Sequence, residues 1–424
     1  MKLAPQQINQ SIKPYLKQSM LLFFAKKYSS IGASSMVRLR NKKESTLHYG
    51  LGCDSSWLIW DYLTNPKSKF RKKYEINRVL ISQVGLEAKG VKEQVEKIIF
   101  PLLREAKIRT IQIARKSSSL RDGYVILEDT DSPVICHTRP TTEKPYYTLE
   151  DEMLWCATVP QYTRGKRYCS DKFKRKILDA YHDQNCPYCM KLIGFDSNER
   201  SRIEKAENDQ QELHPTVYPL YEEGVSREFL VEGLYQETGR RFIRSACTIC
   251  SFSFIAGSAK EIREKFDYNP YEGARAAYVE YVSICFNPRQ SLSTTGKTMV
   301  ERNLLNSAAL ELFKLELEEA VWKIYKVRRI RGLNIPYRHI QALAIGTKQE
   351  MERKFQELIR VTQGELRYCN HGIGRYYLPV RDEKCEEFIV VTPGSPSNDY
   401  KRPGFDTVWA RKNGQFGEQM ALLN

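Results

Sequence analysis

The sequence has no hydrophobic run that is long enough to cross a membrane. The only apolar stretch near its start, residues 20–25, is much shorter than the roughly 20 residues that a transmembrane helix needs. No internal repeat or low-complexity tract stands out, which argues against a repeat array. We therefore expect a soluble, cytoplasmic protein that does not bind membranes.

Two common nucleotide-binding signatures are also missing. The chain lacks a complete Walker motif, G-x-x-x-x-G-K-[ST], and it lacks the three-glycine dinucleotide fingerprint. No secretory leader is recognisable either, so the eleven cysteines are expected to remain reduced. In a reducing compartment, paired cysteines hold metal more often than they form disulfides.

Acidic residues are fewer than basic ones. Lys and Arg number 67 against 51 Asp and Glu, which gives a net charge of +16. Such an excess favours polyanionic partners, either nucleic acids or nucleotides, although a solvated basic surface without a specific partner is an equal alternative. With 424 residues, 41% of them hydrophobic, the chain can form two or more globular domains.

The order of the predicted elements indicates an α/β fold. Strands are expected at 47–49, 78–85 and 109–114, with a helix at 90–107 between the last two. This alternation predicts a doubly wound parallel sheet, followed by a mostly helical region and a small β-rich tail. The expected organisation is a basic helical arm over 1–44, a nucleotide-binding domain with a cysteine metal site over 45–258, a helical domain over 259–362 and a β-rich region over 363–424.

A glycine turn at residues 50–56, GLGCDSS, is the strongest local signal. It lies between the first strand and an amphipathic helix, where glycines allow close approach of an anion and the first amides of the helix are unpaired. The turn is therefore interpreted as a phosphate cradle, formed by Gly50, Gly52, Cys53, Asp54, Ser55 and Ser56. The alternative is an ordinary strand-to-helix turn in which Asp54 and Ser55 only cap the helix.

Two further segments are candidates for the same edge of the sheet. Glu87 follows the second strand and would hold a ribose hydroxyl or Mg²⁺, or would simply be a solvated carboxylate. Residues 164–176 carry seven basic side chains around Cys169, and this density suits an anion clamp that includes Lys174. The alternative is a helix from Asp171 with a basic outer face.

The cysteines form a third signal. CPYC at 186–189 and CTIC at 247–250 are two C-x-x-C pairs, and Cys169 precedes them. Cys169, Cys186, Cys189, Cys247 and Cys250 are therefore predicted metal ligands, for Zn²⁺ or for an iron-sulfur cluster, provided that the fold brings both pairs together. A glutaredoxin-type redox pair at 186–189 and five unrelated buried thiols are the alternatives.

Five blocks in order carry a family resemblance. GLGCDSS, RYCSDKFK, IGFDSNERSR, YPLYEEG and RSACTICSF resemble the PAPS reductase-like branch of the adenine nucleotide alpha hydrolase superfamily, over about residues 46–255. The resemblance implies a sheet of the HUP type with a PP-loop that binds the phosphates of ATP or a sulfonucleotide. It also implies catalytic roles for Asp54, Ser55 and Lys174, and a four-iron cluster on Cys247 and Cys250 with an upstream cysteine.

The sequence departs from that family at three points. Gly50 replaces the first serine of the related SGGxDS loop, and Leu51 replaces its first glycine. The nucleophilic cysteine that PAPS reductases have near the carboxyl terminus, between Glu and Gly, is absent, since Cys369 lies in RYCNHG and Cys385 in EKCEEF. Sulfonucleotide reduction is therefore disfavoured.

The leading hypothesis is an enzyme that cleaves ATP to AMP and pyrophosphate with Mg²⁺ in order to activate a substrate. Sulfur transfer to a tRNA or DNA, with a sulfur donor protein as a partner, fits the resemblance and the basic charge. A sulfonucleotide reductase is one alternative. Another is a non-catalytic nucleic-acid-binding protein with a degraded nucleotide fold, in which Arg328, Arg329 and Arg331 contribute to binding.

Overall fold

The computed structural model describes residues 44–163, 166–186, 189–207, 214–293, 295–332, 337–394 and 403–413. The helical arm predicted over residues 1–44 lies outside the described residues except for Glu44. No helix in the described part of the chain has both the length and the apolar character needed to span a bilayer.

The first sheet has six strands in the order β4-β3-β2-β1-β7-β8. All neighbouring pairs are parallel except β3 and β4, which are antiparallel. Its strands are β1 (Ser45–His48), β2 (Arg78–Gln83), β3 (Arg109–Arg115), β4 (Tyr124–Thr130), β7 (Met190–Ile193) and β8 (Thr216–Val217). The predicted α/β architecture is confirmed, but the sheet is mixed.

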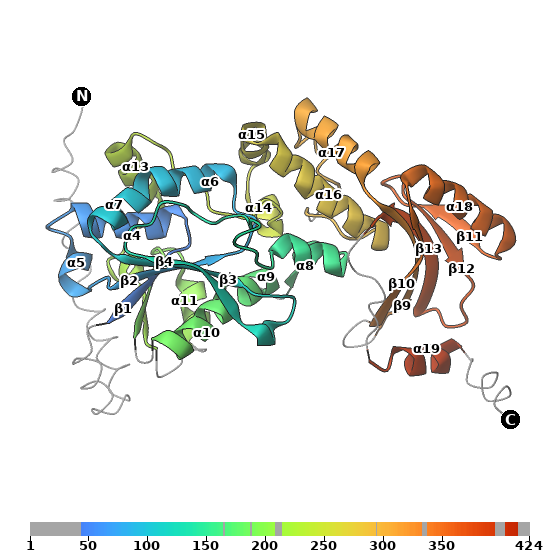
Figure 1. The fold of residues 1–424 in the computed structure, drawn as a ribbon, viewed down its shortest axis with the longest axis horizontal. Helices are drawn as coiled ribbons and strands as arrows, with labels where there is room; N and C mark the ends of the chain where they lie inside the picture. The colour runs from blue at the N-terminus through green and yellow to red at the C-terminus, as the bar shows by residue number, and fades with distance from the viewer. Residues whose placement is uncertain are drawn as a thin grey trace.

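Helices cover both faces of this sheet (Figure 1), so its central strands must be apolar on both sides. Val79, Leu80 and Ile81 of β2 are fully buried in succession. On one side lie α4 (Cys53–Thr64), α6 (Lys89–Gln94), α7 (Phe100–Glu105) and α13 (Arg227–Thr238), and on the other α10 (Lys176–Asn185) and α11 (Arg200–Glu207). A π-helical turn, Val95–Ile99, joins α6 to α7.

Shorter elements fill the connections of this part of the chain. They are α5 (Lys69–Lys73), the 3₁₀ turn Leu120–Asp122, α8 (Leu149–Cys156), the two-stranded ribbon β5 (Tyr162–Thr163) and β6 (Lys166–Arg167), α9 (Tyr168–Ser170) and α12 (Pro219–Glu222). The helix that Ser226 was predicted to cap is α13, and the Ser226 hydroxyl accepts a hydrogen bond from the amide of Phe229. The cap therefore forms as the sequence indicated.

A second sheet has five antiparallel strands in the order β10-β9-β13-β12-β11. They are β9 (Trp322–Ile330), β10 (Tyr337–Gly346), β11 (Glu365–Tyr368), β12 (Gly374–Leu378) and β13 (Cys385–Pro393). The helix α18 (Lys348–Val361) packs on β9 and β13, and α19 (Phe405–Asn413) packs on β10 and β13. The helical region expected over 259–362 is therefore wrong in part, because β9 and β10 belong to this sheet.

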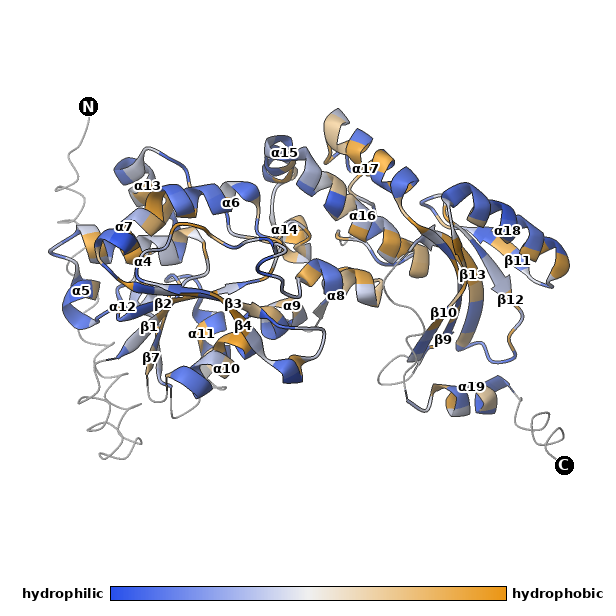
Figure 2. Ribbon diagram, viewed as in Figure 1, coloured by the Kyte–Doolittle hydropathy of each residue, from blue (hydrophilic) through white to orange (hydrophobic). Residues whose placement is uncertain are grey.

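Four helices lie between the two sheets (Figure 1). They are α14 (Ser251–Ala256), α15 (Ala259–Tyr268), α16 (Pro270–Phe286) and α17 (Ser307–Glu319). Hydrophobic residues of α16 and β13 gather where these elements meet (Figure 2), and Phe286 and Val390 share one core cluster there. The helix α16 thus supports the second sheet and also contacts α8, near the first sheet.

Candidate active site and metal centre

The order of the first sheet reverses between β1 and β7. From β1 the chain builds β2 and β3 on one side, and it later returns to add β7 and β8 on the other. In open α/β sheets, ligands bind at such a switch point, beyond the carboxyl ends of the strands. Gly194, directly after β7, lies so close to α4 that a Cβ atom there would be 3.1 Å from the Ser55 amide nitrogen. The glycine turn therefore lies at the switch point.

The turn leaves the start of α4 open. Gly52 is the N-cap residue of α4, and no side chain in the described part of the chain caps this first turn. The hydroxyl of Ser55 accepts a hydrogen bond from the Gly50 amide at 3.3 Å and donates one to the Gly52 carbonyl at 3.4 Å. Amides at a helix start with no side-chain cap suit an anion.

Two of the predicted turn residues are used inside the core. The Ser56 hydroxyl is fully buried and lies 2.9 Å from the Tyr49 hydroxyl. The Cys53 side chain is buried as well, and burial raises the pKa of its thiol to about 12. The amides of these residues, but not their side chains, are thus suited to face a ligand.

Asp54 is paired with a residue from α13. Both of its carboxylate oxygens accept hydrogen bonds from the Arg227 guanidinium, at 3.0 and 2.9 Å. Burial raises the pKa of Asp54, and Asp196 and Glu199 act in the same direction, whereas Arg227 lowers it. Three carboxylates therefore lie near one another at the switch point; Arg227 holds Asp54, and Arg202 pairs with Glu199.

Ser245 connects the glycine turn to the loop after β2. Its hydroxyl lies 2.8 Å from the Gly50 carbonyl and 3.3 Å from a carboxylate oxygen of Glu87. Glu87 is buried, and its backbone forms an antiparallel bridge with Cys247. The segment that carries CTIC thus crosses from the turn to Glu87.

Lys174 approaches Glu87 from the opposite direction. It lies in a π-helical turn, Asp171–Arg175, between α9 and α10, and the Ser82 hydroxyl of β2 anchors this turn through the Phe173 carbonyl at 2.7 Å. The Lys174 ammonium is 3.4 Å from the Glu87 carboxylate. Burial lowers the pKa of Lys174, but the interaction with Glu87 and, to a lesser degree, with Cys247 outweighs it, so that this pKa is raised. A cation therefore lies beside the glycine turn.

Three of the predicted cysteine ligands interact electrostatically with one another and with this lysine. Burial raises the pKa of Cys169, and Cys250 adds to this; burial and Glu87 raise the pKa of Cys247, and Cys250 and Cys169 add smaller contributions. A second cation, Lys265, donates to the carbonyls of Ala246 and Cys247 at 3.0 and 3.2 Å. The thiols of Cys169, Cys247 and Cys250 are thus mutual neighbours in a cationic setting.

A cleft of about 710 Å³ opens on the other side of Glu87. Its volume falls within the range of small-molecule sites. Charged side chains of both signs line it, and they include Lys89, Arg139, Glu272 and Arg275. Glu87 lines this cleft, and Ser245 links Glu87 to Gly50, so the cleft and the glycine turn are connected through these two residues.

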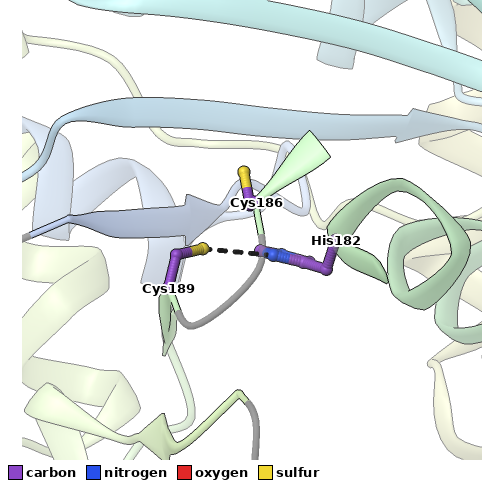
Figure 3. A group of neighbouring side chains, drawn as sticks. All are labelled: His182, Cys186 and Cys189. Carbon is purple, nitrogen blue, oxygen red and sulfur yellow. Dashed lines mark hydrogen bonds between the residues drawn. The ribbon is translucent and has the colours of Figure 1, made fainter. Parts of the chain in front are cut away.

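The other predicted cysteine ligands lie elsewhere. Cys186 and Cys189 pack with Leu80 and Ile111 under the sheet, in a different core cluster from Cys247. They come together with His182, and the three ligand atoms lie within 4.8 Å of one another (Figure 3). Among the described residues, these three form the one group of at least three His, Cys, Asp or Glu side chains whose ligand atoms lie close enough together to hold a metal ion. The expectation that both C-x-x-C pairs share one site is corrected by this separation.

Sequence reasoning did not single out four residues of these sites. Asp196 lies three residues after the end of β7, so the position of ligands at strand ends could have indicated it. His182 precedes Cys186 by four residues on a helix, which is a detectable ligand spacing. Ser245 and Arg227 had no such signal, because only the tertiary structure brings them to the turn.

Comparisons with family models, with curated proteins and with solved structures found no match. The function proposed below therefore rests on the geometry of the two sites and on the five sequence blocks.

Proposed function

We propose that this protein is a PP-loop enzyme that binds an adenine nucleotide at the glycine turn and cleaves ATP to AMP and pyrophosphate. The acceptor oxygen would attack the α-phosphorus, the bond to the bridging oxygen would break, and pyrophosphate would leave with its electron pair. The acceptor would then carry AMP and be activated for substitution, for example by sulfur.

The position of the turn carries this proposal. The open first turn of α4 lies at the switch point of the sheet, and a hydrogen-bonded path runs from Gly50 through Ser245 and Glu87 to Lys174. Backbone amides can bind the phosphates, and a nearby ammonium can stabilise the charge that develops on the leaving group. An electrostatic donor of this kind is commonly worth about 3 kcal/mol in the transition state.

The carboxylates at the switch point suit a magnesium ion. Asp54 and Asp196 offer the oxygen ligands that Mg²⁺ prefers, and the ion would neutralise phosphate charge when it is bound with ATP. Because Arg227 holds Asp54 in the structure, this carboxylate would have to exchange its partner when Mg²⁺ binds.

Cys169, Cys247 and Cys250 suit an iron-sulfur cluster at the same rim. A cluster held by thiolates is anionic, and Lys174 and Lys265 supply positive charge beside it. When bound, such a cluster would supply sulfur or electron chemistry next to the activated acceptor. Zinc on these thiols is the other possibility that the ligands allow.

The acceptor is proposed to be a nucleic acid, either tRNA or DNA, with a sulfur donor protein as a further partner. The net charge of +16 supports a polyanionic acceptor. The cleft that Glu87 lines would supply room for the reacting group, since Ser245 links Glu87 to the glycine turn.

The test is pyrophosphate release by anaerobically purified protein supplied with ATP, Mg²⁺ and tRNA or DNA. We expect ATP to raise the melting temperature, and we expect the Asp54→Ala variant to lose both this shift and the release of pyrophosphate. Asp61→Ala is the matched control, because Asp61 lies on the same helix two turns further on and bonds only with local residues such as Asn65. Identical behaviour of Asp54→Ala and the wild type would refute the proposal.

Two other outcomes would replace the ATP-cleaving enzyme by a sulfonucleotide reductase or by a non-catalytic binding protein. A thiosulfonate on a cysteine after incubation with PAPS or APS, detected by mass spectrometry, would identify a reductase. Nucleic-acid binding that weakens steeply with salt, without any effect of ATP on the melting temperature, would identify a non-catalytic binding protein.

A further inference from the structure

A buried group of nitrogen and sulfur ligands lies under the first sheet, apart from the rim. His182 and Cys186 come from the end of α10, and Cys189 directly precedes β7. The side chains of all three residues are at most 2% exposed. Their ligand atoms lie within 4.8 Å of one another, close to the spacing of about 3.8 Å that two thiolates adopt on one tetrahedral Zn²⁺ with bonds of about 2.3 Å.

Backbone hydrogen bonds hold these residues in place. The Cys186 amide donates to the His182 carbonyl at 2.9 Å, and the Cys189 amide donates to the Cys186 carbonyl at 3.3 Å. The second of these bonds ties the two cysteines of the C-x-x-C pair together, and this spacing allows both sulfurs to bind one metal.

Hydrogen bonds orient the side chain of His182 in the way that is usual for histidines that bind a metal. His182 Nδ1 lies 3.2 Å from the Cys189 sulfur, and His182 Nε2 lies 2.7 Å from His48 Nε2. A histidine ligand usually donates its second N–H to an acceptor, which fixes the tautomer. His48 lies at the end of β1, and its Nε2 is placed to accept this hydrogen bond from His182.

Both sulfurs also have polar neighbours. The Thr46 hydroxyl lies 3.2 Å from the Cys189 sulfur, and the Arg78 guanidinium donates to the Cys186 sulfur. N–H and O–H groups aimed at sulfur stabilise thiolates, which are the form that binds metal.

A second histidine lies next to this group, outside the three residues whose ligand atoms lie within 4.8 Å of one another. His214 is 2% exposed, and its ring centroid is 5.3 Å from that of His182. Its Nδ1 is a buried atom with no hydrogen-bond partner among the described residues. A buried polar atom without a partner is costly, and metal coordination would satisfy it.

We propose that His182, Cys186, Cys189 and His214 bind one structural Zn²⁺. Two thiolates and two neutral imidazoles cancel the charge of the ion, which removes most of the cost of burying it. The mixed nitrogen and sulfur set favours zinc over an iron-sulfur cluster, which is held mainly by cysteines. The ion would connect α10 to β7 and to the start of β8, since His214 lies two residues before β8.

The decisive experiment is anomalous diffraction at the zinc edge from crystals of the wild-type protein. We expect a zinc peak between Cys186, Cys189, His182 and His214. A structure without a metal peak there, or with an iron peak, would overturn the proposal. This result is independent of nucleotide chemistry, so it does not depend on the proposed function.

Metal analysis of variants tests the ligands one by one. Cys186→Ser should lose one zinc per chain, whereas Cys285→Ser should lose none, because Cys285 is an equally buried thiol in α16. His48→Ala should weaken zinc binding about 10- to 100-fold, as expected for a partner of a ligand. His214→Ala should weaken it further, and unchanged affinity in this variant would remove His214 from the site.

Discussion

Leu51 adopts a left-handed backbone conformation inside the glycine turn, with a φ angle of 60°. The SGGxDS loop, which this turn resembles, has a glycine at this position, and glycine tolerates this conformation without cost. In this chain the strain, about 1 to 2 kcal/mol, is offset because the Leu51 side chain is only 2% exposed and packs in the core with Tyr49 and Cys53. The substitution therefore keeps the shape of the turn.

Gly50, which stands where the SGGxDS loop has a serine, is a sterically neutral difference. A Cβ atom on Gly50 would meet only the Ser55 hydroxyl, at 3.9 Å. A serine, the residue at this position of the SGGxDS loop that the turn resembles, would therefore fit here without a clash.

Lys174 gives the first prediction at the residue scale. The Lys174→Met variant keeps the length of the side chain but removes the charge beside Glu87, so we expect about a 100-fold loss in the rate of pyrophosphate release. Lys176→Met is the control, because Lys176 is exposed and pairs only loosely with Asp171 at 3.6 Å. Equal rates in the two variants would show that Lys174 serves packing alone.

At the scale of elements, the contact between β7 and α4 determines the geometry of the turn. Crossovers from a parallel strand place the following loop at the carboxyl edge of the sheet, and the switch point brings two such loops together. The two loops meet where Gly194, directly after β7, approaches the backbone of Asp54 and Ser55 at the start of α4.

This contact predicts different effects of the same substitution at two glycines. Gly194→Ala would put a Cβ 3.1 to 3.3 Å from backbone atoms of Asp54 and Ser55, so the start of α4 must move by a few tenths of an ångström. We expect weaker nucleotide binding, by about tenfold, since displaced amides no longer match the phosphates. Gly50→Ala should bind nucleotide normally, and isothermal titration of both variants would check this.

The π-helical turn at Asp171–Arg175 is a second feature at this scale. The predicted helix from Asp171 does form, but it begins at Tyr168 and carries an extra residue in this turn. Such π-bulges often occur at functional sites, because they redirect side chains on one face of a helix. Here the bulge carries Lys174 toward Glu87.

At the scale of the whole molecule, α16 joins the two sheets and contains a buried acid. Glu280 is 2% exposed, and its carboxylate accepts hydrogen bonds from the amides of Leu292 and Met299, both at 2.8 Å. Burial raises its pKa to about 7 from an ordinary value of 4.5, although these hydrogen bonds oppose the shift.

This acid predicts a pH dependence of stability. Below about pH 4.5 Glu280 is protonated in both the folded and the unfolded chain, and between 4.5 and 7 only the folded chain keeps the proton. The folded state is therefore destabilised as the pH rises through this window, by about 3 kcal/mol when the loss is complete. Above about pH 7 this contribution stays constant.

The Glu280→Gln variant checks this expectation. We expect the free energy of unfolding, measured in urea at several pH values, to depend less on pH between about 5 and 7.5 in the variant than in the wild type. Glu319→Gln, an exposed position at the end of α17, should behave as the wild type. Parallel curves for Glu280→Gln and the wild type would show that another group titrates.

The sequence by itself determined the elements whose signals are local. Alternating strands and helices up to residue 115, the glycine turn and the cap at Ser226 follow from periodicity and from residues next to one another in the chain. The C-x-x-C pairs were equally visible as metal ligands, although Cys186 and Cys189 were assigned to the same site as Cys247.

Only the tertiary structure decided what depends on distant segments. The antiparallel edge strand β4, the start of the second sheet at Trp322 and the separation of the two cysteine pairs all require knowledge of which segments pack together. The same holds for His48 and His214, which lie far from Cys186 in sequence but beside His182 in space. Strand pairing and ligand sets are set by contacts between segments, and local periodicity carries no information about those contacts.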